Sequence, residues 1–289
     1  MKTKIIIGLL AVLTGVVGII IVLSNENALV VNPKGIIAKQ ELALIITNIL
    51  LMLLIIVPTF ILLFAVVWKY CIKKENDDYD PDHHFGTTSQ VIMWILPTII
   101  VAVLALITWD ATYKLNPYKP IESEKKPLTI QVVAMDWKWL FIYPEQGIAT
   151  LNYFYIPEQT PIHFRLTADG SPMNSFWVPQ LSGQIYAMSG MSTQLHLMAD
   201  HLGEFVGRDA EINGEGYSDM TFKVKSTTLK EFEDWTAEMK KSPVKLTQEV
   251  YLELLKPSIN KSLIQYSDVE DDLYHHIVHK YMYPAKPVL

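Results

Sequence analysis

Cysteine is almost absent from this sequence, since Cys71 is the only one among 289 residues. A single thiol excludes a disulfide bond within the chain. Residues 112–289 contain no cysteine at all. Copper pairs bridged by thiolates, and single-copper sites built from two histidines and a cysteine, both require cysteine sulfur. Copper sites of these two kinds are therefore excluded from residues 112–289.

Positive charge is also scarce, because 24 lysines and arginines stand against 30 aspartates and glutamates, a formal net charge of −6. No basic domain or arginine-rich stripe stands out, so we do not expect nucleic acid as a partner. A glycine-rich phosphate loop is lacking as well. Gly190-Met191-Ser192 lacks the flanking glycines of a hydrolase nucleophile elbow. No motif for phosphate binding or for a nucleophilic serine remains.

Long apolar runs are abundant, and all three lie before residue 112: Ile5–Leu23, Leu42–Trp68 and Val91–Trp109. A helix needs about 20 apolar residues to cross the hydrocarbon core of a membrane. The second and third runs therefore predict two transmembrane helices. The first run follows Lys2 and Lys4 and suits a signal peptide, while its length also allows an uncleaved helix.

Lysines between the second and third runs determine the expected topology. Lys69, Lys73 and Lys74 flank the short segment 70–90. Lysine and arginine favour the cytoplasmic side of a membrane. We therefore expect residues 70–90 inside the cell and everything after Ala111 outside it.

A mixed, aromatic-rich sequence follows a polar linker at residues 112–126. Short runs of β-forming residues, such as Leu128–Met135, Thr150–Tyr155 and Gln184–Met188, alternate there with glycine and proline up to residue 224. Many short strands at such spacing predict a β-sandwich or a small barrel.

Helical spacing replaces this pattern in the last part of the chain. Apolar residues recur at helical intervals in Leu229–Met239, Leu246–Leu255 and Asp268–Tyr281. Thr228 and Ser267 are the expected N-caps of the first and third helices. Tryptophan and tyrosine are frequent in this tail, where they either pack into the core or form a docking surface for a partner.

Several motifs in a fixed order carry a family resemblance. They are Met135-Asp136-Trp137-Lys138-Trp139 with Tyr143-Pro144-Glu145-Gln146-Gly147, then Met173-Asn174-Ser175-Phe176, then Gln184-Ile185-Tyr186-Ala187-Met188-Ser189-Gly190-Met191, and an aromatic tail with Trp235, Tyr266 and Tyr281. Placed after two apolar helices, these motifs resemble subunit II of the heme-copper oxidases. Within that family they resemble the quinol-oxidising branch of the bo type.

The resemblance implies both a fold and a function. The fold is a membrane-anchored all-β protein: an N-terminal transmembrane helical hairpin, a cupredoxin-like β-sandwich and a helical C-terminal tail. The function is that of subunit II in a proton-pumping ubiquinol oxidase, an oxidoreductase that couples quinol oxidation to reduction of oxygen to water. Heme, copper and the catalytic residues are expected on the partner, subunit I, and none on this chain. The complex is expected in the bacterial inner membrane, surrounded by lipid, with the C-terminal domain in the periplasm.

One loop shows what this branch has lost. In the cytochrome c-oxidising branch, two coppers are held by the pattern Cys-x-Glu-x-Cys-x-x-x-His-x-x-Met and by a histidine on an earlier strand. The resemblance places Asp209 and Asn213 at the cysteines, Tyr217 at the later histidine and Asn174 at the earlier one, and retains Glu211 and Met220. Met220 is then expected to pack in the core, and Asp209 and Glu211 to face solvent or accept hydrogen bonds in the loop. Trp137 matches the tryptophan that receives electrons from cytochrome c, but here we expect it to serve packing.

The sequence departs from the family in two places. Subunit II of the bo type often matures as a lipoprotein, but Leu23-Ser24 is followed here by Asn25 instead of cysteine. A carboxylate near the cytoplasmic start of the last membrane helix can admit protons in the family, whereas Gln90 stands there in this chain. Glutamine can orient water but cannot carry a proton as a carboxylate does.

Histidines are the remaining candidates for metal binding. His275 and His279 lie four residues apart on an expected helix, a spacing that can hold a metal. With no third ligand near them in sequence, we expect a solvated helix face. His83 and His84 are expected in a loop, and His196 and His201 on the surface or in hydrogen bonds.

Three alternative functions remain open from the sequence. They are subunit II of an aa₃-type menaquinol oxidase, subunit II of a cytochrome c oxidase, and a membrane-tethered binding module outside respiration.

The expected parts of the chain are, in order, a signal peptide or uncleaved apolar segment at 1–24, a short extracytoplasmic segment at 25–40, a transmembrane helix at 41–69, a cytoplasmic loop at 70–90, a second transmembrane helix at 91–111, a cupredoxin-like periplasmic domain at 112–225 and an aromatic-rich helical C-terminal segment at 226–289.

Overall fold

The computed structural model describes residues 15, 18, 28–72, 86–171, 173–259 and 262–282. Most of the N-terminal segment 1–24, with its cleavage and lipidation signals, lies outside these residues. So does most of the expected cytoplasmic loop, with His83 and His84. The described part of the chain divides into two compact units, residues 42–116 and residues 1–41 with 117–289.

Two long helices, α2 (Ile36–Ile72) and α3 (Thr87–Lys114), account for the first of these units. Ile36–Lys69 and Thr87–Lys114 are long and apolar enough to cross a membrane, and almost none of the residues in their most apolar stretches is buried. Exposed apolar side chains over such lengths suit lipid rather than water as the surroundings. The prediction of two membrane-anchoring helices is confirmed, and each helix extends beyond the apolar run that predicted it.

Each anchoring helix contains a proline, Pro58 in α2 and Pro97 in α3. Proline lacks the N–H that would close the helical hydrogen bond one turn back. A threonine follows each of them, and the Thr59 hydroxyl donates to the Ile55 carbonyl at 2.8 Å. The Thr98 hydroxyl makes the equivalent bond at 2.7 Å. These hydroxyls bond the carbonyls of Ile55 and Trp94, which lie next to the carbonyls of Leu54 and Met93 that the prolines leave without their helical donor.

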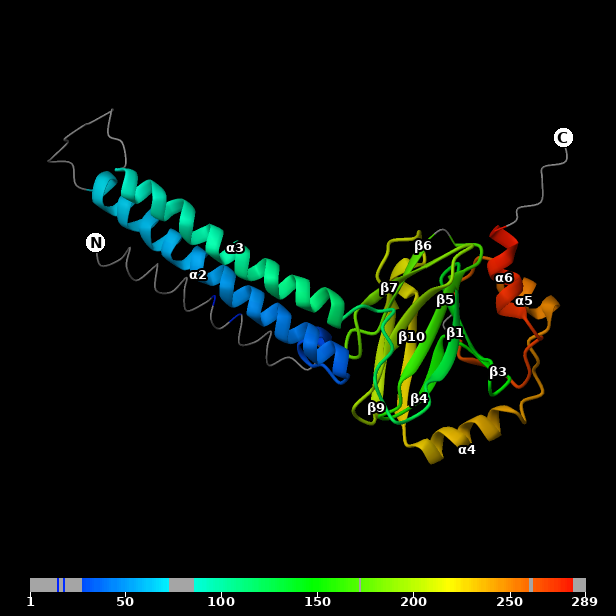
Figure 1. Cartoon of the computed structure of the whole chain (residues 1–289). Helices are drawn as coiled ribbons and strands as arrows, with labels where there is room; N and C mark the ends of the chain where they lie inside the picture. The colour runs from blue at the N-terminus through cyan, green and yellow to red at the C-terminus, as the bar shows by residue number, and fades with distance from the viewer. Residues whose placement is uncertain are drawn as a thin grey trace. The chain divides into compact units, whose positions relative to one another are not determined.

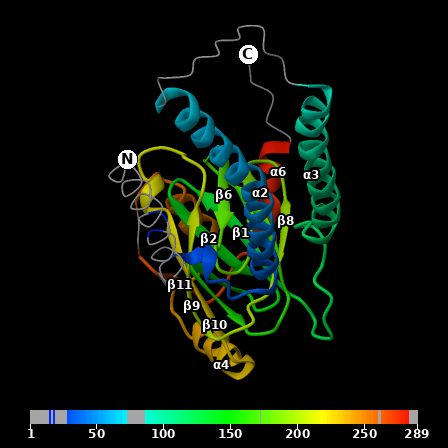
Figure 2. The same ribbon diagram turned by 90° about the vertical axis from the view of Figure 1, so that its left-hand side faces the viewer.

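The second unit is a β-sandwich with helices at its C-terminal end (Figures 1 and 2). Its sheets have the strand orders β11-β3-β2-β1-β5-β8 and β4-β10-β9-β6-β7. The elements of this unit that follow α3 are β1 (Leu128–Met135), β2 (Lys138–Tyr143), β3 (Ile148–Leu151), β4 (Tyr153–Pro157), β5 (Ile162–Ala168), β6 (Met173–Trp177), β7 (Gln184–Met188), β8 (Thr193–Leu197), β9 (Gly203–Asp209), η2 (Tyr217–Asp219), β10 (Thr221–Thr227), α4 (Leu229–Met239), α5 (Gln248–Leu254), β11 (Ile264–Tyr266) and α6 (Leu273–Met282).

The prediction of one strand at Thr150–Tyr155 was wrong, because the chain forms two strands there, β3 and β4. β3 pairs with β2 in one sheet, and β4 pairs with β10 in the other. Between them Asn152 adopts a positive φ of 61°, a conformation that asparagine tolerates better than most residues. Its side-chain oxygen accepts the Trp139 backbone N–H at 3.0 Å. This single residue therefore carries the chain from one sheet to the other.

Aromatic rings fill the space between the two sheets. Trp139, Phe141, Phe154, Phe176 and Phe222 are all buried. The rings of Phe176 and Phe222, from the same sheet, stack with centroids 4.9 Å apart. Phe141 and Phe154 meet across the sheets at 4.7 Å. Offset and tilted aromatic pairs of this kind add to the free energy that burial supplies.

A second hydrophobic cluster covers the outer face of the sheet that contains β1 and β2. The cluster contains Val133, Met135 and Leu140 from those strands, together with Tyr251 of α5 and Tyr274 of α6. The C-terminal segment is therefore a third layer on the sandwich, and α6 lies against that sheet in Figure 1. Of the two roles expected for the tail aromatics, core packing is the one that Tyr251, Tyr266 and Tyr274 have, since all three are buried.

In this segment α4 agrees with its prediction, whereas the start of α6 does not. α4 has its expected bounds, and Thr228 forms a capping box with Glu231. Ser267 was a wrong prediction for an N-cap, because α6 begins only at Leu273, after Asp272 with a φ of 60°. The short strand β11 was not expected, and it pairs with β3 at the edge of the sheet.

The residues around the start of α2 contact the sandwich directly. The Gly35 N–H donates to the Gln180 carbonyl at 3.0 Å. A Cβ at Gly35 would come within 2.6 Å of the Leu181 carbonyl oxygen, so only glycine allows this approach. Lys39 and Asp200 form an ion pair at 2.6 Å.

Candidate functional site

The residues expected at the former copper-ligand positions come from neighbouring strands of one sheet. Asn174 lies on β6 and Asp209 ends β9, and these strands pair through Phe176 and Asp209. Asn213 and Met220 lie on the β9–β10 loop, residues 210–220. Asn174, Asp209 and Met220 are buried. The fold therefore brings four of the six positions together.

Asn213 is the centre of this cluster. Its side-chain Nδ2 donates to Asp209 Oδ2 at 2.8 Å, to Asn174 Oδ1, and toward the Met220 sulfur at 3.3 Å. An amide nitrogen has two hydrogens, so three acceptors share them. Among the described residues, the buried Asn213 Oδ1 has no hydrogen-bond partner. We call Asn174, Asp209, Asn213 and Met220 the amide cluster.

The carboxyl group of Asp209 is held by backbone donors. The Ser175 N–H donates to Asp209 Oδ1 at 2.6 Å, and the Glu211 N–H donates to the same oxygen at 3.2 Å. Burial raises the pKa of Asp209 from 3.8 to about 6, although these backbone hydrogen bonds act to lower it. Of the two roles expected for Asp209, it therefore has that of a hydrogen-bond acceptor in the loop and not that of a solvent-facing residue.

Two of the six expected positions stand apart from the amide cluster. Glu211 is half-buried and contributes only its backbone N–H, and Tyr217 lies half-buried in η2. Neither side chain joins the hydrogen bonds of the amide cluster in the part of the chain that the structure describes. Met220 contacts the aromatic core, in keeping with its expected packing role.

The donor atoms of the amide cluster do not suit a copper pair. They are amide oxygen and nitrogen, carboxylate oxygen and one thioether. A thiolate-bridged copper pair needs soft, anionic sulfur. The residues present therefore do not fit the dinuclear copper group of the cytochrome c-oxidising branch.

Both tryptophans beside this loop serve packing. Trp137 occupies the β1–β2 turn with a φ of 60°, and a Cβ at Gly216 would come within 2.3 Å of its ring. Trp139 is fully buried and meets Phe176 and Phe222 edge-on, with centroids 5.5 and 5.6 Å away. The expected packing of Trp137 therefore has a specific partner, the backbone of the β9–β10 loop.

Sequence reasoning missed a buried carboxylate that fastens the C-terminal segment. Asp169, which is 1% exposed, accepts from Tyr251 at 2.7 Å, Tyr281 at 2.6 Å and the Lys280 amine at 2.8 Å. Burial and the negative charge of Asp169 raise the pKa of Tyr251 well above its usual value. The only sequence signal was the aromatic tail itself, because nothing local marks Asp169 as the acceptor. We call these four residues the Asp169 clasp.

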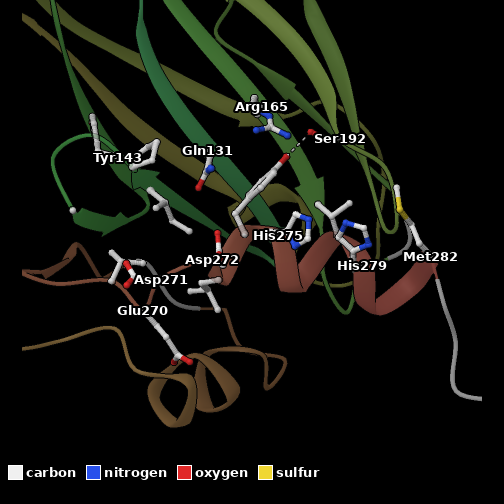
Figure 3. Close-up of a pocket in the computed structure, with 17 residues that line it drawn as sticks. Gln131, Tyr143, Arg165, Ser192, Glu270, Asp271, Asp272, His275, His279 and Met282 are labelled. Carbon is white, nitrogen blue, oxygen red and sulfur yellow. Dashed lines mark hydrogen bonds between the residues drawn. The ribbon is translucent and has the colours of Figure 1, made fainter.

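A pocket of about 650 Å³ lies between α6 and the outer face of the sheet (Figure 3). The Ser192 and Tyr274 hydroxyls meet there at 2.9 Å, and the Arg165 guanidinium lies 5.4 Å from the Tyr274 ring centre. His275 and His279 line the same pocket from α6, with ring centres 3.9 Å apart. His275 is exposed. Among the described residues, no third His, Cys, Asp or Glu joins them in a ligand set.

The other expected histidines fall into two classes. His196 is buried, its Nδ1 lies 3.0 Å from the Pro117 carbonyl oxygen, and its ring stacks on His163 at 4.6 Å. Burial and the neighbouring His196 lower the pKa of His163. His201 is exposed. His196 therefore has the hydrogen-bonding role that was expected, and His201 lies on the surface.

Comparison with known proteins identifies the family. The COX aromatic rich motif matches residues 240–285. The cytochrome bo(3) ubiquinol oxidase subunit 2 of Pseudomonas aeruginosa is 47% identical over 86% of this chain and 75% of that protein. The chain belongs to the quinol oxidase subunit 2 family. The quinol oxidase subunit 2 of Bacillus cereus is 43% identical over 81% of each chain.

Among solved structures, a periplasmic domain resembles the β-sandwich of this chain. It is the periplasmic domain of subunit II of cytochrome oxidase from Bradyrhizobium japonicum, which is 22% identical and matches with a TM-score of 0.40. The likeness covers 43% of this chain and 98% of that one.

The family motif at residues 240–285 covers β11 and the helices α5 and α6, including three residues of the Asp169 clasp.

Proposed function

We propose that this chain is the non-catalytic subunit 2 of a ubiquinol oxidase and holds no copper centre of its own. The amide cluster carries the proposal. Asn174, Asp209 and Asn213 stand where the resemblance puts copper ligands, in a stretch without cysteine, and they hydrogen-bond to one another. A copper centre that accepts electrons from an outer carrier is unnecessary if quinol, dissolved in the bilayer, delivers electrons directly to the partner subunit.

The division of labour in the complex follows from this proposal. Heme, copper and the residues that reduce oxygen belong to subunit I, which couples the reaction to proton pumping. This chain braces subunit I through the exposed apolar surfaces of α2 and α3. Its sandwich caps the outer face of the partner. Gln90 in the first turn of α3 orients water at most, since an amide does not carry protons as a carboxylate does.

The proposed orientation places the sandwich in the periplasm of a bacterial cell. Lys69 near the end of α2, with Lys73 and Lys74 after it, keeps the loop at 70–90 in the cytoplasm. The membrane is then the inner membrane, and the sandwich follows α3 on its outer side.

Menaquinol is the second candidate substrate. The 43% identity to a Bacillus cereus protein named only as a quinol oxidase subunit keeps this alternative open beside the relative named for ubiquinol. A cytochrome c oxidase is disfavoured by the absence of cysteine from residues 112–289. A binding module outside respiration is disfavoured by the family to which the chain belongs.

The decisive experiment is purification of the complex in mild detergent through a tag on this chain. We expect heme protein to copurify and oxygen uptake to start with a soluble ubiquinol analogue but not with reduced cytochrome c. Extraction of the bound quinone, with oxygen uptake on a menaquinol analogue, separates the two quinols. Oxygen uptake driven by cytochrome c, or a well-expressed chain without any heme protein, would overturn the proposal.

A further inference from the structure

The turn that follows β5 is described at residues 169–171, and together with Asn174 of β6 it is held from two sides. Asp169 and Gly170 on one side contact the C-terminal segment. Asn174 on the other side belongs to the amide cluster. The turn therefore connects the Asp169 clasp to the amide cluster.

Among the described residues of the C-terminal segment, Tyr281 binds both the Asp169 side chain and the Gly170 backbone. Its hydroxyl donates to Asp169 Oδ1 at 2.6 Å and accepts the Gly170 backbone N–H at 3.0 Å. Gly170 has a φ of 80°, which a residue with a side chain rarely adopts. Tyr251 also donates to Asp169, at 2.7 Å, but no hydrogen bond of the described residues joins its side chain to Gly170.

Hydrogen bonds continue from the turn to the β9–β10 loop. The Asn174 amide exchanges two bonds with the Ser171 hydroxyl, at 2.9 and 3.1 Å. Asn174 Oδ1 in turn accepts from Asn213, which donates to Asp209 at 2.8 Å. Ser171 and Asn174 are both buried. Because water does not compete with these bonds, a change at one end alters the free energy of the bonds at the other.

The β9–β10 loop needs such support. Ordering each loop residue costs backbone entropy of about 1 kcal/mol or more. A bound metal would offset that cost by joining several loop residues to one point. In this chain the hydrogen bonds of the amide cluster join the loop residues instead. They hold the loop only if Asn174 keeps its position.

We propose that the aromatic-rich C-terminal segment is a brace for the β9–β10 loop, acting through Tyr281, the turn residues 169–171 and Asn174. The brace takes the ordering role that a metal would have. This inference deepens the proposed function, because it assigns a task to the family motif in a subunit without its own copper. Tyr281 is a positioning residue in this scheme and touches no substrate.

Hydrogen–deuterium exchange on the full-length chain in detergent tests the brace. Tyr281→Phe removes the bond to Gly170, and Tyr251→Phe is the matched control, since each variant deletes one phenolic donor to Asp169. We expect Tyr281→Phe to raise amide exchange in residues 210–220 by about threefold or more, the effect of one lost hydrogen bond. Tyr251→Phe is expected to raise exchange in α5 and to leave residues 210–220 as in the wild type.

Coupling between two sites must be reciprocal. Asn174→Ala, at the other end of the route, is therefore expected to raise exchange in α6, and this arm stands even if Tyr281→Phe fails to fold. Unchanged exchange of residues 210–220 in a folded Tyr281→Phe chain, or equal effects of the two phenylalanine variants there, would overturn the brace. Oxygen uptake and quinone content test the proposed function separately, so either proposal can fail alone.

Discussion

At the scale of single side chains, Asn213 supplies the donor that two buried oxygens share. Asp209 Oδ2 and Asn174 Oδ1 both accept from its amide. Asn174 Oδ1 also accepts from the Ser171 hydroxyl at 3.1 Å, so among the described residues it is Asp209 Oδ2 that loses its donor with Asn213. Leaving a buried acceptor without a donor costs more than one hydrogen bond contributes when it is made. The cluster is therefore sensitive to loss of this one residue.

Asn213→Ala is expected to lower the free energy of unfolding of the β-sandwich domain by about 1–3 kcal/mol. Denaturant unfolding of the full chain in detergent, followed by tryptophan fluorescence, measures the change. The neighbouring Ile212, which is 80% exposed, provides the control. Ile212→Ala is expected to change stability by less than about 0.5 kcal/mol, and equal effects of the two variants would contradict the account of the cluster.

Asp209 gives the domain a specific dependence on pH. Burial raises its folded-state pKa to about 6, above its usual 3.8. Between these values the folded state binds a proton that the unfolded state does not bind, so this group adds stability as pH falls from about 7 to 4. Asp209→Asn is expected to remove that gain. Melting curves of both proteins at several pH values measure the difference, and parallel curves would refute the assignment.

At the scale of elements, the C-terminal segment depends on the Asp169 clasp. Three donors converge on one carboxylate that is 1% exposed. Partial burial acts to lower the pKa of Lys280, but the hydrogen bond and negative charge of Asp169, together with Tyr281, raise it above its usual value. A charged acceptor of this kind contributes more than a neutral one.

Asp169→Asn is expected to reduce the protection of α6 against hydrogen exchange by about 2–3 kcal/mol, because hydrogen bonds to a charged group are lost. Asp268→Asn is the control. Its ion pair with Lys245 at 3.0 Å is exposed on both sides and contributes less than about 1 kcal/mol. Similar protection of α6 in the two variants would show that the clasp does not fasten the segment.

Local pattern was sufficient where an element has a clear period and clear ends. Leu128–Met135, Gln184–Met188 and Leu229–Met239 have the predicted bounds, because alternation or capping residues mark them. The crossing at Asn152 was missed, because one asparagine between β-forming residues, with no glycine or proline beside it, is also compatible with a continuous strand. β11 was missed because a strand of three residues forms only by pairing with β3.

The candidate site was also predicted only in part. The resemblance assigned six positions, and the fold joins four of them because the β6–β9 pairing places Asn174 beside Asp209. Glu211 and Tyr217 lie on parts of the loop whose course depends on Trp137 and Gly216 packing together. Asp169 was not predicted, because its donors follow it by 82 to 112 positions in the chain.

At the scale of the whole molecule, the chain consists of two apolar helices and a β-sandwich covered by a third layer. The helices leave their apolar surfaces exposed, as the proposed contacts with lipid and subunit I require. The sandwich carries no cysteine, and hydrogen bonds join four of the six positions that the resemblance assigns to copper ligands. Such a chain can support an oxidase in the membrane but cannot itself receive electrons through a thiolate-bridged copper pair.

Copper analysis of the separated chain tests this account most directly. The active complex is purified, its subunits are separated without chelators, and copper is measured in each. The account predicts that copper remains with the partner subunit and that this chain contains none in stoichiometric amount. Stoichiometric copper on this chain, in a complex that still oxidises quinol, would contradict it.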